Sequence, residues 1–166
     1  MRRMMALALG SLLLIAGAPV PAAPATGRLA AVGVPVVVTA HNGKLVATAR
    51  ISKAPAGPDT VMQTQWPFSE FQAPRSQVGR IRITVSGRDV IVPLSAVMGL
   101  YEPGEVALKA DRSGFVLQIH GGDAYLAYDA RIRFDGTDVL ERTITGGESG
   151  QLQERTTYNT APFPYE

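Results

Sequence analysis

The chain contains no cysteine, only two histidines, and no long apolar run beyond its first residues. Without cysteine, the sequence excludes disulfides, thiol nucleophiles and lipid attachment at a cysteine. A zinc site needs three or four ligands, usually from cysteine and histidine, so two histidines offer little material for one. The fold must therefore be held by burial of an apolar core, for which roughly 140 residues after the leader are sufficient.

The first 25 residues have the pattern of a cleaved signal peptide. A short positive start precedes an uncharged apolar run at residues 6–18, and Ala23-Pro24-Ala25 matches the small-x-small cleavage pattern. This predicts a mature start near Thr26, whereas cleavage after Ala18 is disfavoured because a proline would follow the cut. The alternative, a membrane-spanning helix, needs about 20 apolar residues. We therefore predict a periplasmic or secreted protein with no stable membrane anchor after cleavage.

Net charge is also lacking once the leader is set aside. The leader carries two of the 16 basic residues, which leaves 14 basic and 14 acidic residues. We expect no nucleic-acid partner, because nothing in this balance indicates a polyanion-binding surface. The two halves differ, since residues 28–88 carry eight basic and two acidic residues and residues 89–166 carry six and twelve. This asymmetry predicts either attraction within one domain or a dipolar surface that steers a charged partner.

Turn residues recur throughout the rest of the chain and separate short β-branched runs. Residues 80–85 show the clearest pattern, because Ile81, Ile83 and Val85 alternate with polar residues. Predicted strands are residues 34–40, 44–51, 80–85, 90–94, 106–110, 115–119, 125–134, 139–145 and 153–158. Predicted turns or loops are residues 41–43, 54–59, 86–87, 102–105, 111–114, 120–123, 135–138 and 146–150.

These patterns predict an all-β fold after the signal peptide. We expect a single antiparallel β-sandwich or open-barrel domain built from hairpins, extending over residues 26–160. Residues 95–101 are expected to form one helical turn, and residues 61–77 have no regular pattern. The tail, residues 161–166, is predicted to be disordered.

The stretch His120-Gly-Gly-Asp123 is the one motif with a catalytic appearance. As a site, it would use His120 as a metal ligand or general base oriented by Asp123. The sequence favours a turn instead, because glycine accepts a positive φ and aspartate bonds its own backbone in turns. A metal-dependent hydrolase that uses His41 and His120 is retained as the least favoured alternative.

Other catalytic arrangements find no support in the sequence. Residues 135–138 resemble a calcium loop only superficially, because such a loop needs alternating oxygen ligands and a distal bidentate glutamate. Glu102 and Glu105 flank a Pro-Gly pair and are expected to be solvated turn residues. No Gly-x-Ser-x-Gly elbow is present. We therefore predict a non-enzymatic protein with no catalytic residues, metal or cofactor.

The candidate binding residues are aromatic and basic. Tyr125 and Tyr128 have opposite parity on one strand, so only one of them can face the core, and the other is free to bind a partner. Aromatic and arginine side chains anchor protein interfaces. The predicted binding residues are Trp66, Phe68, Phe71, Arg80, Arg82, Tyr125 and Tyr128.

Two rows of arginines could be paired with acidic residues instead of binding a partner. Arg80 and Arg82 share a strand face, as do Arg131 and Arg133, and such arginines often pair with acids across strands. Here the expected acidic partners are Asp129, Glu141 and Glu154.

The sequence as a whole predicts an exported, non-enzymatic interaction module that contacts a protein partner in the cell envelope. The alternative is a carrier for a small apolar ligand held in the mouth of a β-barrel.

Overall fold

The computed structural model describes residues 25–57 and 74–159, most of which form antiparallel strands in two sheets. The six-stranded sheet consists, in order, of β1 (Ala25–Arg28), β6 (Pro103–Asp111), β7 (Gly114–Gly121), β8 (Tyr128–Phe134), β9 (Val139–Gly146) and β10 (Leu152–Thr157). The four-stranded sheet consists of β2 (Val36–Asn42), β3 (Leu45–Pro55), β4 (Ser76–Val85) and β5 (Arg88–Asp89). The prediction of an all-β antiparallel fold is confirmed.

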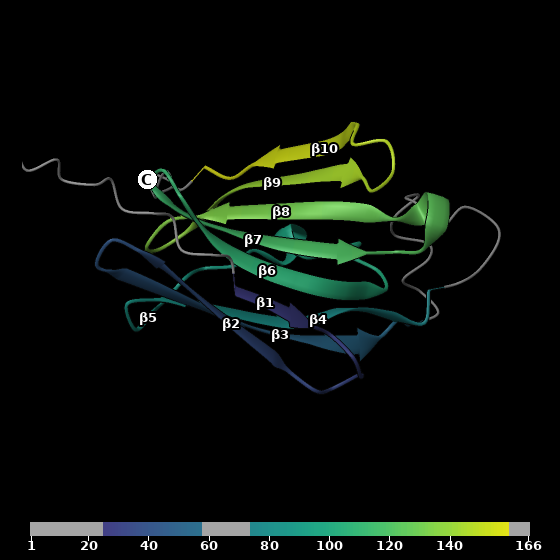
Figure 1. The fold of residues 1–166 in the computed structure, drawn as a ribbon, viewed down its shortest axis with the longest axis horizontal. Helices are drawn as coiled ribbons and strands as arrows, with labels where there is room; N and C mark the ends of the chain where they lie inside the picture. Colours follow the sequence, from purple (N-terminus) through teal and green to yellow (C-terminus); the bar gives the residue numbers. More distant parts are fainter. Residues whose placement is uncertain (1–24, 58–73, 160–166) are drawn as a thin grey trace, which may run out of the picture.

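The two sheets form two layers around one hydrophobic core (Figure 1). Alternate residues of each strand point inward, as the period of two requires. In β4, for example, Ile83 and Val85 are buried while Arg82 is exposed, which confirms the predicted alternation. Phe115 and Phe134 stack in the core with ring centroids 5.8 Å apart. The fully buried side chains from the two sheets include Ile51, Ile83, Leu108, Leu117, Ile119, Ile132 and Phe134.

The six-stranded sheet extends past the four-stranded one. Figure 1 shows β9 and β10 at the edge farthest from β2 and β3. The segment after β5 covers the inner side of β9, and it includes the 3-10 helix η1 (Leu94–Ala96). Ala96 and Leu100 of this segment are fully buried. The β9–β10 edge is therefore covered by a short connection rather than by strands.

The β2–β3 hairpin forms where the sequence predicts it, but the turn is one residue later. Asn42 pairs with Leu45, so the two turn residues are Gly43, with φ 59°, and Lys44. The Asn42 side chain instead donates hydrogen bonds to the Asp111 and Gly114 carbonyl oxygens, at 2.7 and 2.9 Å. This contact ties the hairpin to the turn between β6 and β7.

The predicted strand at residues 90–94 is wrong. The strand β5 ends at Asp89, and Val90 donates one more backbone hydrogen bond to Ile83 O of β4 at 2.9 Å. Ile91 then forms an isolated bridge to Asp138, which directly precedes β9. Its backbone N–H donates to Thr137 O at 2.8 Å. Pro93 then starts η1, where its fixed φ is tolerated and its missing N–H costs nothing. The helical turn expected at residues 95–101 is found, but it begins one residue earlier, at Leu94, and ends at Ala96.

Two further boundaries differ because strand pairing continues into predicted turns, and another differs because a 3-10 helix replaces the start of a predicted strand. β3 runs to Pro55, which pairs with Ser76, so the predicted loop at residues 54–59 begins later. β6 begins at Pro103, which pairs with Gly121, so the predicted turn at residues 102–105 is wrong. β8 begins only at Tyr128, because residues 124–126 form the 3-10 helix η2 (Ala124–Leu126).

The predicted leader lies outside the described residues, except for Ala25 in β1, and the predicted tail lies outside them entirely. Within the described ranges, no helix is long and apolar enough to cross a membrane.

Candidate functional site

His120-Gly-Gly-Asp123 lies at the end of a strand and in the turn that follows it. His120 and Gly121 are the last residues of β7, and the chain turns at Gly122, which has φ 75°. A side chain at Gly121 would collide with the Tyr128 ring, so each glycine has its own structural reason. His120 Nδ1 lies 3.1 Å from Asp129 Oδ1 across the strands, not beside Asp123, and both side chains are about half exposed.

The two histidines cannot share a metal ion. In β2, Val38 and Ala40 point into the core, so His41 points out of the four-stranded sheet. In β7, Leu117 and Ile119 point inward, so His120 points out of the six-stranded sheet. The two rings therefore lie on opposite outer faces. Among the described residues, no group of three or more histidine or acidic side chains is placed to hold a metal ion.

Residues 135–138 form a turn, as predicted. Asp135 Oδ1 accepts hydrogen bonds from the Thr137 and Asp138 backbone N–H groups at 2.8 and 2.9 Å. These hydrogen bonds, led by that from Thr137, hold the pKa of Asp135 below its ordinary value. The carboxylate is thus used in fixing its own turn.

Glu102 is not the solvated turn residue that the sequence predicts. Its Oε1 accepts the Arg75 and Ser76 backbone N–H groups at 2.5 and 3.0 Å, and its Oε2 accepts Ser76 Oγ at 2.8 Å. Partial burial alone would raise the pKa of Glu102, but these hydrogen bonds outweigh it and lower the pKa. Because Ser76 begins β4 and Glu102 precedes β6, this carboxylate joins the two sheets at one corner.

The structure describes only some of the residues of the predicted aromatic surface. Trp66, Phe68 and Phe71 lie outside the described residues, as does the Tyr125 side chain. Tyr128 is 2 % exposed and donates a hydrogen bond to Tyr101 O at 2.9 Å. Burial raises the pKa of Tyr128. Tyr128 is therefore a core residue and not part of a binding surface, and the parity argument does not apply because Tyr125 lies in η2 rather than on β8.

Arg80 and Arg82 lie together on the outer side of the four-stranded sheet, and Arg50 joins them. The three arginines, called here the basic face, line a shallow depression of about 170 Å³ with Pro35, Ile51 and Ser52. Arg82 Nε and Nη2 donate to the two oxygens of Asp89 at 2.8 and 3.0 Å. Hydrogen bonding to Asp89 raises the pKa of Arg82, and the same bond lowers that of Asp89.

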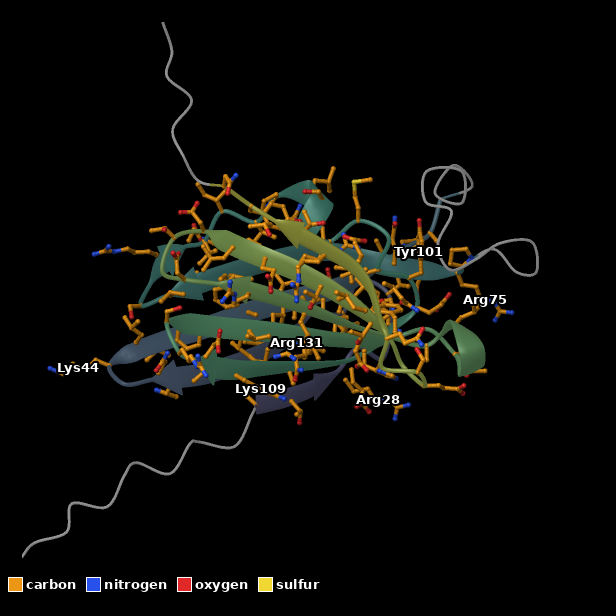
Figure 2. All side chains as sticks on the ribbon, turned by 90° about the horizontal axis from the view of Figure 1, so that it is seen from above. Arg28, Lys44, Arg75, Tyr101, Lys109 and Arg131 are labelled. Carbon is orange, nitrogen blue, oxygen red and sulfur yellow. The ribbon has the colours of Figure 1, made fainter. Side chains whose placement is uncertain are left out.

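The second predicted stripe, Arg131 and Arg133, lies on the outer side of the six-stranded sheet. Arg133 is directly opposite Glu141 in the register, but the ion pair of Glu141 is with Arg155 Nε, at 3.8 Å. Figure 2 shows Arg131 near Lys109 on this sheet. Glu141 thus forms an ion pair with an arginine of a neighbouring strand, as expected, but the arginine is Arg155 rather than Arg131 or Arg133.

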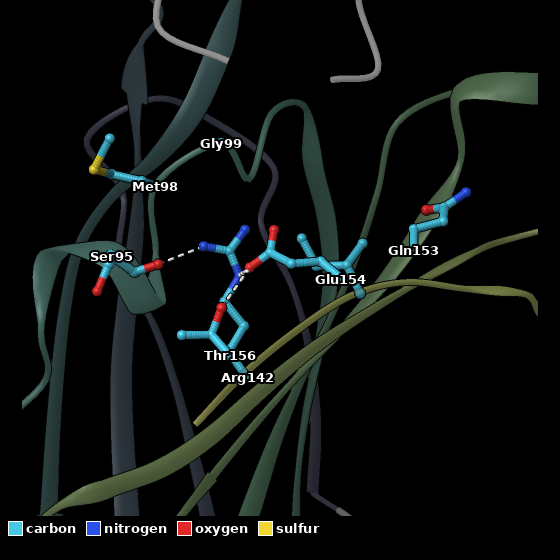
Figure 3. Close-up of a pocket in the computed structure, with 8 residues that line it drawn as sticks. Ser95, Met98, Gly99, Arg142, Gln153, Glu154 and Thr156 are labelled. Atoms are coloured by element: carbon cyan, nitrogen blue, oxygen red, sulfur yellow. Dashed lines mark hydrogen bonds and ion pairs between the residues drawn. The ribbon is translucent and has the colours of Figure 1, made fainter. Parts of the chain in front are cut away.

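One hollow with a buried charged residue in its lining was not predicted from the sequence. It is a notch of about 400 Å³ between the η1 segment and the inner side of β9 and β10 (Figure 3). Arg142 forms its floor and is only 5 % exposed, while Glu154 stands at the rim with 42 % of its side chain exposed. The notch is lined by Ser95, Met98, Gly99, Arg142, Ile144, Gln153, Glu154 and Thr156.

Arg142 is incompletely satisfied for a buried cation. One terminal nitrogen, Nη1, donates to Ser95 O. Its Nε lies 3.3 Å from Glu154 Oε1, yet within the described part of the chain no hydrogen bond to Nε is formed. A sequence signal existed, because Arg142 falls between Leu140 and Ile144 on an otherwise apolar strand face.

No protein-family model matches the chain, and neither a curated protein nor a solved structure matches it.

Proposed function

We propose that this chain is an exported, non-enzymatic interaction module whose basic face contacts an acidic surface of a partner protein in the cell envelope. The leader at residues 1–25 supports the periplasmic or secreted location. The basic face supports the mode of contact. The contacts of three acidic groups support binding rather than catalysis, because Asp129 pairs with His120 across the strands, Asp135 stabilises its own turn and Glu102 joins the two sheets.

The observation that carries this proposal is the register of β3 and β4. Arg50 is directly opposite Arg82, so two like charges face each other across neighbouring strands. Such a pair destabilises a sheet, and Arg80 adds a third charge two residues along the same face. Only Arg82 has a carboxylate partner among the described residues. An arrangement that costs stability is expected where binding needs it.

The surroundings favour a protein partner. Val37 completes the cross-strand row with Arg50 and Arg82, and its side chain is 52 % exposed. An exposed apolar residue beside arginines fits an interface with an apolar centre and a charged rim. The charge asymmetry of the sequence follows the fold, because strands β2–β5 carry almost none of the acidic residues. An acidic partner surface would therefore be attracted to this sheet over some distance.

The test is affinity capture from envelope extract with the immobilised protein. A double variant, Arg50→Glu with Arg80→Glu, reverses the basic face. The matched control, Arg28→Glu with Lys109→Glu, makes the same charge change on the six-stranded sheet, where Figure 2 shows both residues. We expect one stoichiometric protein on the wild type and on the control, and its loss from the Arg50/Arg80 variant.

The proposal is wrong if no protein is retained by the wild type, or if both variants lose it equally. Equal loss would show that net charge, not the basic face, holds the partner. Retention should also weaken as salt is raised, because contacts between exposed charges are screened.

A carrier function is the second candidate, and the notch at Arg142 is the observation that favours it. Its volume of about 400 Å³ lies within the range of small-molecule sites. The site is an edge notch rather than the mouth of a barrel, so the carrier would bind its ligand beside the core.

A further inference from the structure

The notch has the chemistry of a site for an anionic amphiphile. Arg142 occupies a core-facing position of β9, between the partly buried edge strand β10 and the η1 segment. A guanidinium has five N–H donors in a planar fork, and a buried polar group without an acceptor is costly. Within the described residues, Arg142 uses one donor on Ser95 O, and its Nε has no hydrogen bond. The floor of the notch therefore presents spare donors to an incoming acceptor.

Glu154 occupies the position that such an acceptor would take. Its Oε1 accepts Thr156 Oγ1 at 3.0 Å and stands 3.3 Å from Arg142 Nε without a hydrogen bond (Figure 3). It belongs to an edge strand with a register shift between Leu152 and Glu154, and 42 % of its side chain is exposed. Glu154 can therefore turn to solvent at low cost. A ligand carboxylate that replaces it keeps the buried cation paired, and the charge of the floor does not change.

Two apolar side chains also line the notch. Met98, which is 38 % exposed, comes from the segment after η1, and Ile144 lies on β9 beside Arg142. Methionine adapts to ligands of irregular shape because its side chain is flexible and polarisable. An alkyl chain with a carboxylate end matches both parts of the notch.

We propose that the notch binds a carboxylate-bearing amphiphile, with its carboxylate on the Arg142 guanidinium in place of Glu154 and its alkyl chain against Met98 and Ile144. A planar carboxylate can accept two parallel N–H donors from arginine, which gives both affinity and orientation. This site is separate from the basic face and does not depend on the proposed protein partner.

The test is calorimetric titration of the purified protein with octanoate and with octanol, which share an alkyl chain and differ in the head. We expect saturable one-to-one binding of octanoate, with octanol weaker by about tenfold, the amount a charge-assisted hydrogen bond provides. Glu154→Gln removes the competing carboxylate and should strengthen octanoate binding roughly threefold to tenfold. Glu148→Gln is the matched control, because Glu148 is an exposed acid outside the notch, and it should change neither affinity.

Three results would overturn the proposal: no binding of octanoate up to millimolar concentration, equal affinity for octanoate and octanol, or weaker octanoate binding in Glu154→Gln. The decisive variant keeps Arg142, so the outcome does not depend on whether changes at that buried residue still fold. Failure here would leave the affinity-capture result untouched, because none of these residues belongs to the basic face.

Discussion

Glu102 and Glu154 are both carboxylates at sites where connecting segments meet the sheets, but their surroundings differ. Glu102 receives three hydrogen bonds from Arg75 and Ser76, and its pKa is lowered as a result. Glu154 receives one, from Thr156, and stands beside Arg142 without a hydrogen bond to its Nε. The first site is saturated and therefore structural, whereas the second retains donors that a ligand can use.

The largest effect is expected when Glu102, the carboxylate with the complete set of hydrogen bonds, is removed. Glu102→Ala leaves the Arg75 and Ser76 donors without their acceptor and removes the hydrogen bonds that join the two sheets at this corner. We expect the free energy of unfolding to fall by about 2–3 kcal/mol, since hydrogen bonds to charged groups are the stronger ones. Urea denaturation measures this loss. Glu105→Ala, at an exposed position nearby, is the control and should stay within about 0.5 kcal/mol of the wild type.

Protonation of Glu102 at low pH should weaken the same hydrogen bonds and lower the free energy of unfolding by a smaller amount. The pKa of Glu102 is lower in the folded state than its ordinary value of 4.5, so its contribution is fully present above that pH. The contribution is lost as the pH falls through the lowered folded pKa. Urea midpoints measured from pH 6 down to about pH 3 should therefore drop less steeply in Glu102→Gln than in the wild type.

Asp135 supplies the control for the acid series. Its pKa is also lowered, by its own turn, so Asp135→Asn should remove a separate part of the acid sensitivity. If Glu102→Gln and the wild type lose stability in parallel, the carboxylate at the corner is not the group that acid disrupts.

The smallest effect is expected at Glu154. Because its ion pair with Arg142 lacks good geometry and its side chain is 42 % exposed, Glu154→Gln should change the free energy of unfolding by less than about 1 kcal/mol. Thermal or urea unfolding without ligand measures this. A loss as large as that of Glu102→Ala would make the Arg142 pair structural and erase the difference between the two sites.

Local patterns predicted the strands well where the alternation of apolar and polar residues was strict. Residues 80–85 alternate strictly, and β4 buries the faces that the pattern indicates. The predictions were wrong where a distant partner decided the outcome. Pro103 is in a strand because Gly121 pairs with it. Asn42 is the last residue of β2 rather than a turn residue, and its side chain donates hydrogen bonds to carbonyl oxygens some 70 residues away.

The candidate sites were predictable only in part, for a related reason. Arg80 and Arg82 were visible on one strand face, but Arg50 joins them through the β3–β4 register, which local sequence does not specify. Arg142 interrupts an apolar face between Leu140 and Ile144, which signals a buried charge but not the notch around it. A hollow between a sheet edge and a connection depends on how far one sheet extends past the other.

The pairing of β1 with β6 also limits how early one edge of the six-stranded sheet can form. In the chain that starts at the predicted Thr26, the first β1 residue pairs with Ala107, which lies 81 positions later. At a synthesis rate of about 5–20 residues per second, the partner of β1 arrives on the order of 10 s after β1 itself. Hairpins such as β2–β3 can close within microseconds of emerging. The first edge of the six-stranded sheet therefore cannot close before β6 has been synthesised, and the ribosome sets this minimum time rather than the physics of strand pairing.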